Sequence, residues 1–411
     1  MGELRRHLGV ADAVVIGLGS MIGAGVFVAW GPAAAAAGSW LLVGLLIAGA
    51  VALCNAMSSA QLAALHPESG GTYVYARERL GPAWGHLAGW GFVVGKTAST
   101  SAMALAIGAY VWPEQREWVA TLAVVAILLV NLGGLSRTVT VTRLLLVSSS
   151  VALVAVVIGS ILRDRSQMVL ASEVDADVLG VLRAAGFLFF AFAGYARVAT
   201  LGEEVRDPAV TIPRAVPRAL AAVLVIYLVI GSAALHAVPP GALALADAPL
   251  ALVMESGRLA GITWIVTAGA TIASLGVLLN LVPGVARTVL AMARRRELPA
   301  WFAVVDDRRS LPIRAEVSVA AVTVGLVHTL SITSSIAVSG VAVLTYYALT
   351  NLSALRLGSE ERRWHPVVAS VGLIGCVVLV SSLPRAAIVG GSVVILAGVI
   401  VRRITIRMTD A

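Results

Sequence analysis

Four glycines interrupt the first long apolar stretch of the chain, which reads Ile16-Gly-Leu-Gly-Ser-Met-Ile-Gly-Ala-Gly-Val-Phe27. In a bilayer every backbone N–H and C=O must be bonded, so a helix that unwinds there is tolerated only where its freed groups face protein, water or a ligand. One half-helix then offers its amides and positive dipole end to a carboxylate, and the other offers its carbonyls to an ammonium or a cation. The pattern predicts a binding site for a small zwitterion.

The composition indicates a polytopic membrane protein, because 59% of the residues are hydrophobic, only 13% are charged and the mean hydropathy is +0.93. A run of roughly 20 apolar residues spans the hydrocarbon core, and we predict twelve such helices without a soluble domain. The expected spans are 12–36, 40–65, 84–112, 118–134, 141–162, 181–202, 215–238, 259–286, 314–331, 335–357, 366–383 and 386–403.

The basic residues set the expected orientation. With the N-terminus inside, 22 of the 30 lysines and arginines fall in inner segments and 6 in outer ones, which is the bias of the positive-inside rule. We therefore expect both termini to be cytoplasmic and the protein to lie in the cytoplasmic (plasma) membrane. Anionic lipid accounts for the net charge of +8, so no nucleic-acid partner is expected.

No metal site is expected, because Cys54 and Cys376 lie in separate apolar spans and the six histidines are scattered along the chain. None of these histidines forms a pair four residues apart, which is a common ligand spacing on a helix. The cysteines are interpreted as small core residues, and neither a disulfide nor a bound cofactor is predicted.

The sixth span carries a second interruption, since Gly194 lies in the middle of the segment from Phe187 to Glu204. Interrupted helices at corresponding places in two halves of a chain are typical of inverted-repeat transporters, whose site lies between the repeats. The second interruption comes five spans after the first, and this odd offset makes the second copy enter the membrane from the opposite side.

Several motifs in the right order resemble the amino acid-polyamine-organocation (APC) permeases, nearly from end to end. They are Ile22-Gly-Ala-Gly-Val-Phe27, Pro67-Glu-Ser-Gly-Gly-Thr-Tyr-Val-Tyr75, Glu203-Glu-Val-Arg-Asp-Pro208 with Ile212-Pro-Arg-Ala215, Ala286-Arg-Thr-Val-Leu-Ala-Met-Ala293 and Tyr346-Tyr-Ala-Leu-Thr-Asn-Leu352. The resemblance implies one transporter domain over 1–411 with a LeuT-type fold. Its first repeat is about 12–162, its second about 181–357, and two peripheral helices cover about 366–403.

The resemblance also implies the substrate site. The backbone of 22–25 is expected to hold a substrate carboxylate, and the carbonyls near Met21, Phe190 and Ala193 are expected to hold its amino group. The expected site residues are Met21, Ile22, Gly23, Ala24, Gly25, Phe190, Ala193, Gly194 and Tyr195. Phe190 matches an aromatic residue that closes over the substrate from outside in relatives. The alternatives are that the glycines serve helix packing and that Phe190 is an ordinary packing or lipid-facing residue.

The chain departs from the family at two positions. Ala196 and Arg197 follow Gly194-Tyr195, where many relatives have an acidic residue. Some proton-coupled relatives have a lysine in the fifth span, and the residue nearest to the matching position here is Ser149. Lys96, which is the only lysine, lies deep in the third span instead. A charge at that depth is costly and usually functional, so Lys96 is a candidate proton carrier, or else a static amine bonded to the carbonyls of a broken helix.

Three further features bear on coupling and gating. Arg197 is expected to pair with Glu203 or Glu204 or to reach the inner interface, and as an inner gate it would lock the sixth span. Thr271 and Ser274 of the eighth span, with Ser149, offer hydroxyls to a sodium ion, although such hydroxyls commonly bond the preceding turn. Protons, sodium or exchange all remain open as the driving force.

We predict a secondary amino acid permease that works by alternating access, with no enzyme activity. Lys96 and Arg197 are the charges within the predicted spans closest to the site, so neutral amino acids fit better than acidic ones, and cationic amino acids or polyamines are the alternative. A non-transporting amino acid sensor on the same fold is a further alternative. No convergent catalytic groups point to an enzyme. The oligomeric state is not predicted.

Overall fold

The computed structural model describes residues 8–66, 70–133, 139–162, 174–199, 205–306 and 311–410, which form helices joined by short loops. The first half contains α1 (Val10–Met21), α2 (Gly25–Val28), α3 (Trp30–Ala37), η1 (Gly38–Trp40), α4 (Leu41–Leu65), α5 (Thr72–Leu80), α6 (Pro82–Val111), η2 (Pro113–Gln115), α7 (Arg116–Leu132) and α8 (Val139–Ile161). The second half contains α9 (Val178–Phe192), η3 (Ala193–Tyr195), α10 (Ala196–Ala199), α11 (Pro208–Ala237), α12 (Pro240–Leu245), α13 (Pro249–Glu255), η4 (Ala260–Ile262), α14 (Trp264–Arg294), η5 (Ala300–Ala303), α15 (Ile313–Thr329) and α16 (Ile332–Leu355). Two helices, α17 (Pro366–Ser382) and α18 (Arg385–Asp410), follow.

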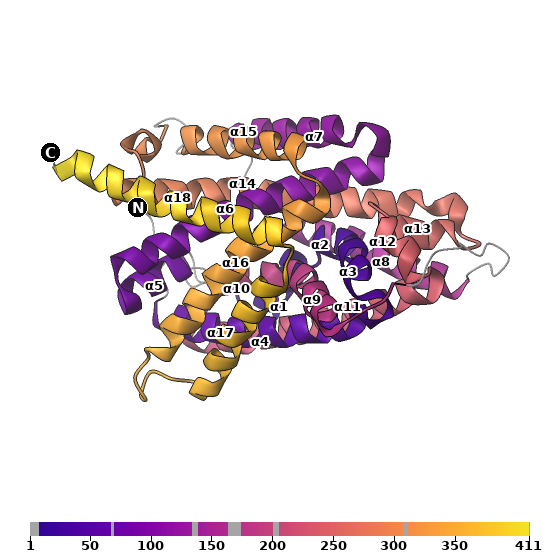
Figure 1. Cartoon of the computed structure of the whole chain (residues 1–411), viewed down its shortest axis with the longest axis horizontal. Helices are drawn as coiled ribbons and strands as arrows, with labels where there is room; N and C mark the ends of the chain where they lie inside the picture. The colour runs from indigo at the N-terminus through magenta and orange to yellow at the C-terminus, as the bar shows by residue number, and fades with distance from the viewer. Residues whose placement is uncertain are drawn as a thin grey trace.

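Helices α6, α7, α14, α15 and α18 run roughly lengthwise, α16 and α17 cross them obliquely, and α5 and the end of α18 lie at the opposite end from α12 and α13 (Figure 1). Within the described residues, nine helices are long and apolar enough to cross a membrane, and two shorter apolar helices cover Leu145–Ile161 and Pro366–Ser382. The all-helical, membrane-spanning class is therefore confirmed. The exact number of spans and the repeat arrangement stay predictions.

Each predicted span contains a helix, but three of the spans have bounds that differ by a turn or more. The seventh helix begins at Pro208 rather than at 215, because a proline suits the first helical position, where no amide bond is lost. The eighth runs from Trp264 to Arg294, and the twelfth continues to Asp410, beyond the predicted 286 and 403. Arginines lie in both extended segments, at 287 and 294 in the eighth helix and at 407 in the twelfth, and charge marks where apolar sequence stops rather than where a helix does.

Helix α6 lies at the centre of the bundle, where it packs against α16, α14, α5 and α7. Helix α1 packs against α11, and α4 packs against both α11 and α9. The elements that carry the two predicted interruptions are thus enclosed by α4, α6, α11 and α16. Gly71 and Gly81, with φ of 57° and 108°, flank α5 and set it apart from the helices on either side.

A buried amide pair joins three helices inside the bundle. The Asn351 Nδ2 of α16 donates to the Asn55 Oδ1 of α4 at 2.6 Å, and the Asn55 Nδ2 lies 3.3 Å from the Cys376 Sγ of α17. Both asparagines are fully buried. Cys376 is a free, buried cysteine, as expected, and it also completes this polar contact.

Candidate functional site

The first predicted interruption is present. Helix α1 ends at Met21, and Ile22, with ψ of 64°, turns the chain out of the helical path. The Gly23 amide then donates to the Met21 carbonyl at 2.7 Å, and helix starts again at Gly25. The first amides of a helix have no acceptor within it, so the turn around Ala24 presents backbone donors, and their binding of a substrate carboxylate stays a prediction.

The second interruption lies where Gly194 predicted it. Helix α9 begins at Val178 after the N-cap residue Asp177, whose side chain accepts from the Gly180 amide at 2.6 Å, and it ends at Phe192. A single 3₁₀ turn, Ala193–Tyr195, separates it from α10. A 3₁₀ turn changes the direction of the carbonyls, and here it frees the carbonyl of Ala193 for side chains of other helices.

The two interruptions lie directly against each other. A Cβ on Gly194 would fall 2.5 Å from the Ser20 carbonyl carbon and 2.8 Å from the Met21 amide nitrogen. A Cβ on Gly25 would fall 2.8 Å from the Ala191 Cα. These glycines therefore allow two backbones to touch, so the packing interpretation holds for both. It does not exclude the binding one, because close packing is what brings the amides of one break near the carbonyls of the other.

Tyr227 of α11 joins both interrupted helices, and sequence reasoning missed it. Its hydroxyl lies 2.6 Å from the Met21 carbonyl and 3.0 Å from the Ala191 carbonyl, and the ring is fully buried. A hydroxyl has one proton for these two acceptors, which it shares between them. A tyrosine in an otherwise apolar span was the available signal, but only the fold shows which carbonyls it reaches.

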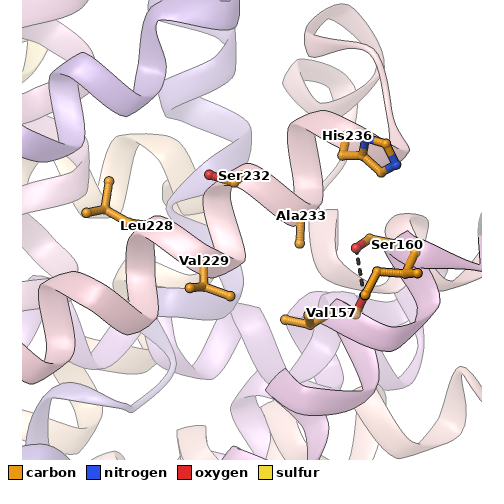
Figure 2. A pocket seen from close by; sticks show the side chains of 8 residues that line it. Val157, Ser160, Leu228, Val229, Ser232, Ala233 and His236 are labelled. Carbon is orange, nitrogen blue, oxygen red and sulfur yellow. Dashed lines mark hydrogen bonds between the residues drawn. The ribbon is translucent and has the colours of Figure 1, made fainter.

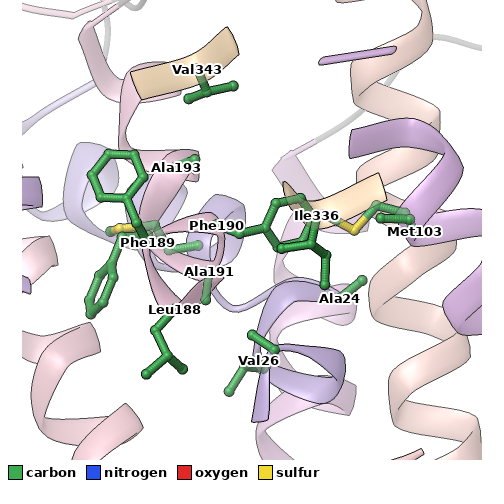
Figure 3. Close-up of a cluster of buried hydrophobic side chains, with 14 of the residues drawn as sticks. Ala24, Val26, Met103, Leu188, Phe189, Phe190, Ala191, Ala193, Ile336 and Val343 are labelled. Atoms are coloured by element: carbon green, nitrogen blue, oxygen red, sulfur yellow. The ribbon is translucent and has the colours of Figure 1, made fainter. Parts of the chain in front are cut away.

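Phe190 is buried and points into the bundle. Figure 3 shows its ring directed toward Met103 of α6 and Ile336 of α16, with Ala24 of the first break below it. Only 6% of Phe190 is exposed, so the lipid-facing alternative does not hold. The side chains beside the two breaks are thus apolar, and Met103 and Ile336 had no sequence signal that set them apart from other core residues.

Lys96 reaches the second break. Its Nζ lies 3.4 Å from the Ala193 carbonyl oxygen, and the Tyr347 hydroxyl of α16 donates to the same oxygen at 3.4 Å. Tyr347 in turn stacks on Tyr195, with ring centroids 5.0 Å apart. The structure therefore brings Lys96 together with the expected substrate-site residues, and it adds Tyr347, which lies in one of the family-like motifs.

Arg197 lies on α10 and is exposed. Its predicted partners Glu203 and Glu204 fall outside the described residues, so that pairing stays a prediction. The position on the surface of α10 separates the guanidinium from the enclosed residues around Phe190. A direct contact with substrate is correspondingly less favoured by the geometry than a role at the inner end of the second break.

The candidate sodium ligands are bonded within their own helices. The hydroxyls of Ser149, Thr271 and Ser274 donate to the carbonyls of Leu145, Thr267 and Ala270 at 2.7 to 2.8 Å. This is the ordinary bonding of hydroxyls in membrane helices. A hydroxyl that donates its proton keeps oxygen lone pairs for a cation, so sodium coupling stays a prediction.

A second polar cluster, centred on Glu297, lies after the end of α14. Its carboxylate accepts from the Tyr73 hydroxyl at 2.8 Å and from Arg77 at 2.5 Å, both on α5, and the His86 Nδ1 lies 3.8 Å away. Burial alone raises the pKa of Glu297, but the hydrogen bonds and the Arg77 charge outweigh it and hold the pKa below its usual range. The cluster ties α5 to the ends of α6 and α14.

An open groove of about 420 Å³ lies elsewhere, between α8 and α11 (Figure 2). Val157 and Ser160 line one side, and Ser232, Ala233 and His236 line the other. None of the residues recorded along it belongs to a helix break. The groove is mostly apolar, and we assign the solute site to the breaks instead.

Two interrupted helices that meet inside a helical membrane bundle are typical of one class of protein, the membrane transporters that bind a small solute at such interruptions. A family model described as amino acid permease matches residues 12–402. The chain therefore belongs to the amino acid permease family.

Individual relatives agree with this assignment. The chain is 54% identical to an uncharacterized transporter of Mycobacterium tuberculosis over 98% of its own length and 93% of the relative's. It is 22% identical to the branched-chain amino acid permease BcaP of Bacillus subtilis, over 97% and 92% of the two lengths. It is 27% identical to the vacuolar cationic amino acid transporter 4 of Arabidopsis thaliana, over 77% and 57%.

Proposed function

We propose that this protein is a secondary transporter that moves neutral α-amino acids across the cytoplasmic membrane by alternating access. The direct contact of the two helix breaks carries this proposal, because it sets backbone amides and backbone carbonyls on either side of one small site. Membership in the amino acid permease family supports the substrate class. Twelve spans in a LeuT-type 5+5 arrangement, with both termini cytoplasmic, are part of the same proposal.

In this proposal the substrate binds by its zwitterionic backbone. Its carboxylate accepts from the amides of Ala24 and Gly25, where the dipole of the following helix favours negative charge, while the Gly23 amide stays bonded to the Met21 carbonyl and holds the turn. Its ammonium donates to carbonyls of the second break, at Phe190 and Ala193. The Phe190 ring closes the outer side, and its direction toward Met103 and Ile336, above Ala24 in Figure 3, supports that role.

Neutral side chains fit the surroundings best. Phe190, Met103 and Ile336 present apolar surface beside the breaks, and Lys96 is the nearest charged group that the structure places there. A cationic side chain would lie against this apolar surface and, while Lys96 is protonated, would also meet repulsion from its ammonium. The names of the relatives include both a branched-chain and a cationic transporter, so the preference for neutral substrates rests on these residues of the chain itself.

Uptake into proteoliposomes tests the proposal. Purified protein is reconstituted with and without internal amino acid, and entry of radiolabelled L-leucine, L-alanine, L-arginine and L-glutamate is compared, with proton or sodium gradients imposed in turn. We expect L-leucine or L-alanine to enter fastest. Gly284→Ala is the matched control, because a Cβ there meets nothing within 4 Å, and it should transport like the wild type.

Two results would contradict the proposal in different ways. Uptake of L-arginine well above the neutral amino acids would overturn the substrate class and leave the transporter intact. Binding of amino acids without movement in any gradient or exchange condition would instead indicate the sensor alternative.

A further inference from the structure

The Ala193 carbonyl is already occupied in the structure. Its oxygen has two lone pairs, and it accepts from the Lys96 Nζ and from the Tyr347 hydroxyl, each at 3.4 Å. Both contacts are near the long limit of a hydrogen bond. These two hydrogen bonds are therefore weak, and the Ala193 carbonyl can be released from them to accept from another donor. The 2.6 Å contact of Tyr227 with the Met21 carbonyl is shorter and stronger.

The Lys96 ammonium forms no ion pair with a carboxylate among the described residues. The recorded ion pairs are Arg77–Glu297, His86–Glu297, Arg79–Glu361, Arg116–Glu117 and Arg116–Asp247. The titratable groups that face Lys96 are Tyr347 from α16 and, stacked on it, Tyr195 from η3. Lys96 itself is 8% exposed.

Charged groups on the other elements packed against α6 lie in the first or last few turns of their helices, and Arg287, two turns before the end of α14, is exposed. Arg77 of α5 and Glu297, which follows α14, lie close to His86 of α6. His86 comes ten residues before Lys96, which is about 15 Å along the helix at 1.5 Å per residue. Glu316 is in the first turn of α15, and Arg116 begins α7. In α18 the arginines are at position 385 and at 402, 403 and 407.

This inference rests on the proposed function, in which the ammonium of the amino acid donates to the Ala193 carbonyl. Two ammonium groups at one buried carbonyl would repel each other strongly, because little water is present to screen them. The substrate therefore needs Lys96 to give up that position or its charge. A neutral amine removes the repulsion, and its lone pair then accepts a hydrogen bond from the substrate ammonium.

We propose that Lys96 is a displaceable internal occupant of the amino-group subsite, and that an amino acid binds in its place by expelling one proton from the Lys96 Nζ to water. The N–H bond of Lys96 breaks, water takes the proton, and the substrate remains a zwitterion. Substrate and proton then exclude each other at the site. Such a carrier exchanges amino acid against protons or against a second amino acid, and does not carry the two together.

Proton counting during binding tests this proposal. Binding of L-leucine, and of L-alanine in parallel, to the full chain in nanodiscs is measured by calorimetry in two buffers of different ionisation enthalpy, from pH 6 to pH 9. We expect the wild type to release close to one proton per amino acid at the acid end. Its affinity should rise about tenfold per pH unit until Lys96 is neutral in the free protein.

Three variants separate displacement from other roles. Lys96→Met should bind without proton release, with pH-independent affinity at least equal to the wild type at pH 6. Lys96→Arg keeps a charge that cannot be lost, so it should bind weakly at every pH, and it provides the test if the methionine variant fails to fold. Tyr347→Phe is the matched control, because it removes the other donor to the same carbonyl and should leave the proton release in place.

Proton uptake on binding would overturn the proposal, because it would mean that charged Lys96 pairs with the substrate carboxylate. Unchanged proton release in Lys96→Met would overturn it as well. A wild-type protein that neither binds nor transports any amino acid of the panel would refute the proposed function itself, so the two failures are distinguishable.

Discussion

Gly194→Ala is the sharpest test of how the two helix breaks are held together. The added Cβ would lie 2.5 Å from the carbonyl carbon of Ser20 and 2.8 Å from the amide nitrogen of Met21. These are backbone atoms, so no side chain can rotate away. Restoring ordinary contact near 3.5 to 4.0 Å requires the two segments to separate by about 1 Å.

The expected cost follows from this overlap. Extra volume in a well-packed interior destabilises by about 1–3 kcal/mol, and the backbone origin of the clash places Gly194→Ala toward the upper end. The separation also pulls the Ala193 carbonyl away from the first break, so we expect most of the amino acid uptake to be lost even in protein that still folds.

The control is Gly284→Ala, on α14, where the new Cβ meets nothing within 4 Å. Alanine is a better helix former than glycine by roughly 0.5–1 kcal/mol, so this variant should be as stable as the wild type or slightly more stable. Unfolding of both variants in mixed detergent and SDS micelles gives the free energies, and proteoliposome uptake gives the activity. Equal stability and uptake in the two variants would refute the packing derived for the breaks.

Three further substitutions test other contacts. Tyr227→Phe removes a hydroxyl shared by two carbonyls, including that of Met21, and should cost about 1 kcal/mol in the same unfolding assay; an unchanged free energy would contradict its bridging role. Glu297→Gln should destabilise most at neutral pH: the folded pKa lies below the ordinary 4.5, so the carboxylate contributes stability above that value and loses it as pH falls through the folded pKa. Thermal unfolding at several pH values checks this, and a difference from wild type that stays constant on acidification would count against it. Asn351→Ala removes the strong donor to the Asn55 Oδ1, leaves Asn55 only its weak contact with Cys376, and should cost about 1–3 kcal/mol; a double-mutant cycle with Asn55→Ala should give a coupling above about 0.5 kcal/mol, and additive effects would contradict the pair.

The sequence located both helix breaks because glycine acts locally. Gly23 and Gly25 weaken the helix wherever the chain is placed, and Gly194 does so in the sixth span, so the interruptions followed from residue type and spacing alone. The membrane class followed for the same reason, because a long apolar run needs no knowledge of its neighbours to be recognised. Lys96 was likewise conspicuous as one amine in an apolar span.

Only the tertiary structure decided what these residues touch. A single sequence does not show that Gly194 packs on Ser20, that the Tyr227 hydroxyl reaches Met21, or that Lys96 and Tyr347 share the Ala193 carbonyl, because each contact joins helices far apart in the chain. The predicted ends of helices near charged loops were also wrong. Hydropathy indicates where the apolar sequence stops, whereas the backbone hydrogen bonds of a helix can continue beyond that point. Local helix propensity thus determined where the two helices are interrupted, and long-range packing decided which groups meet at the interruptions.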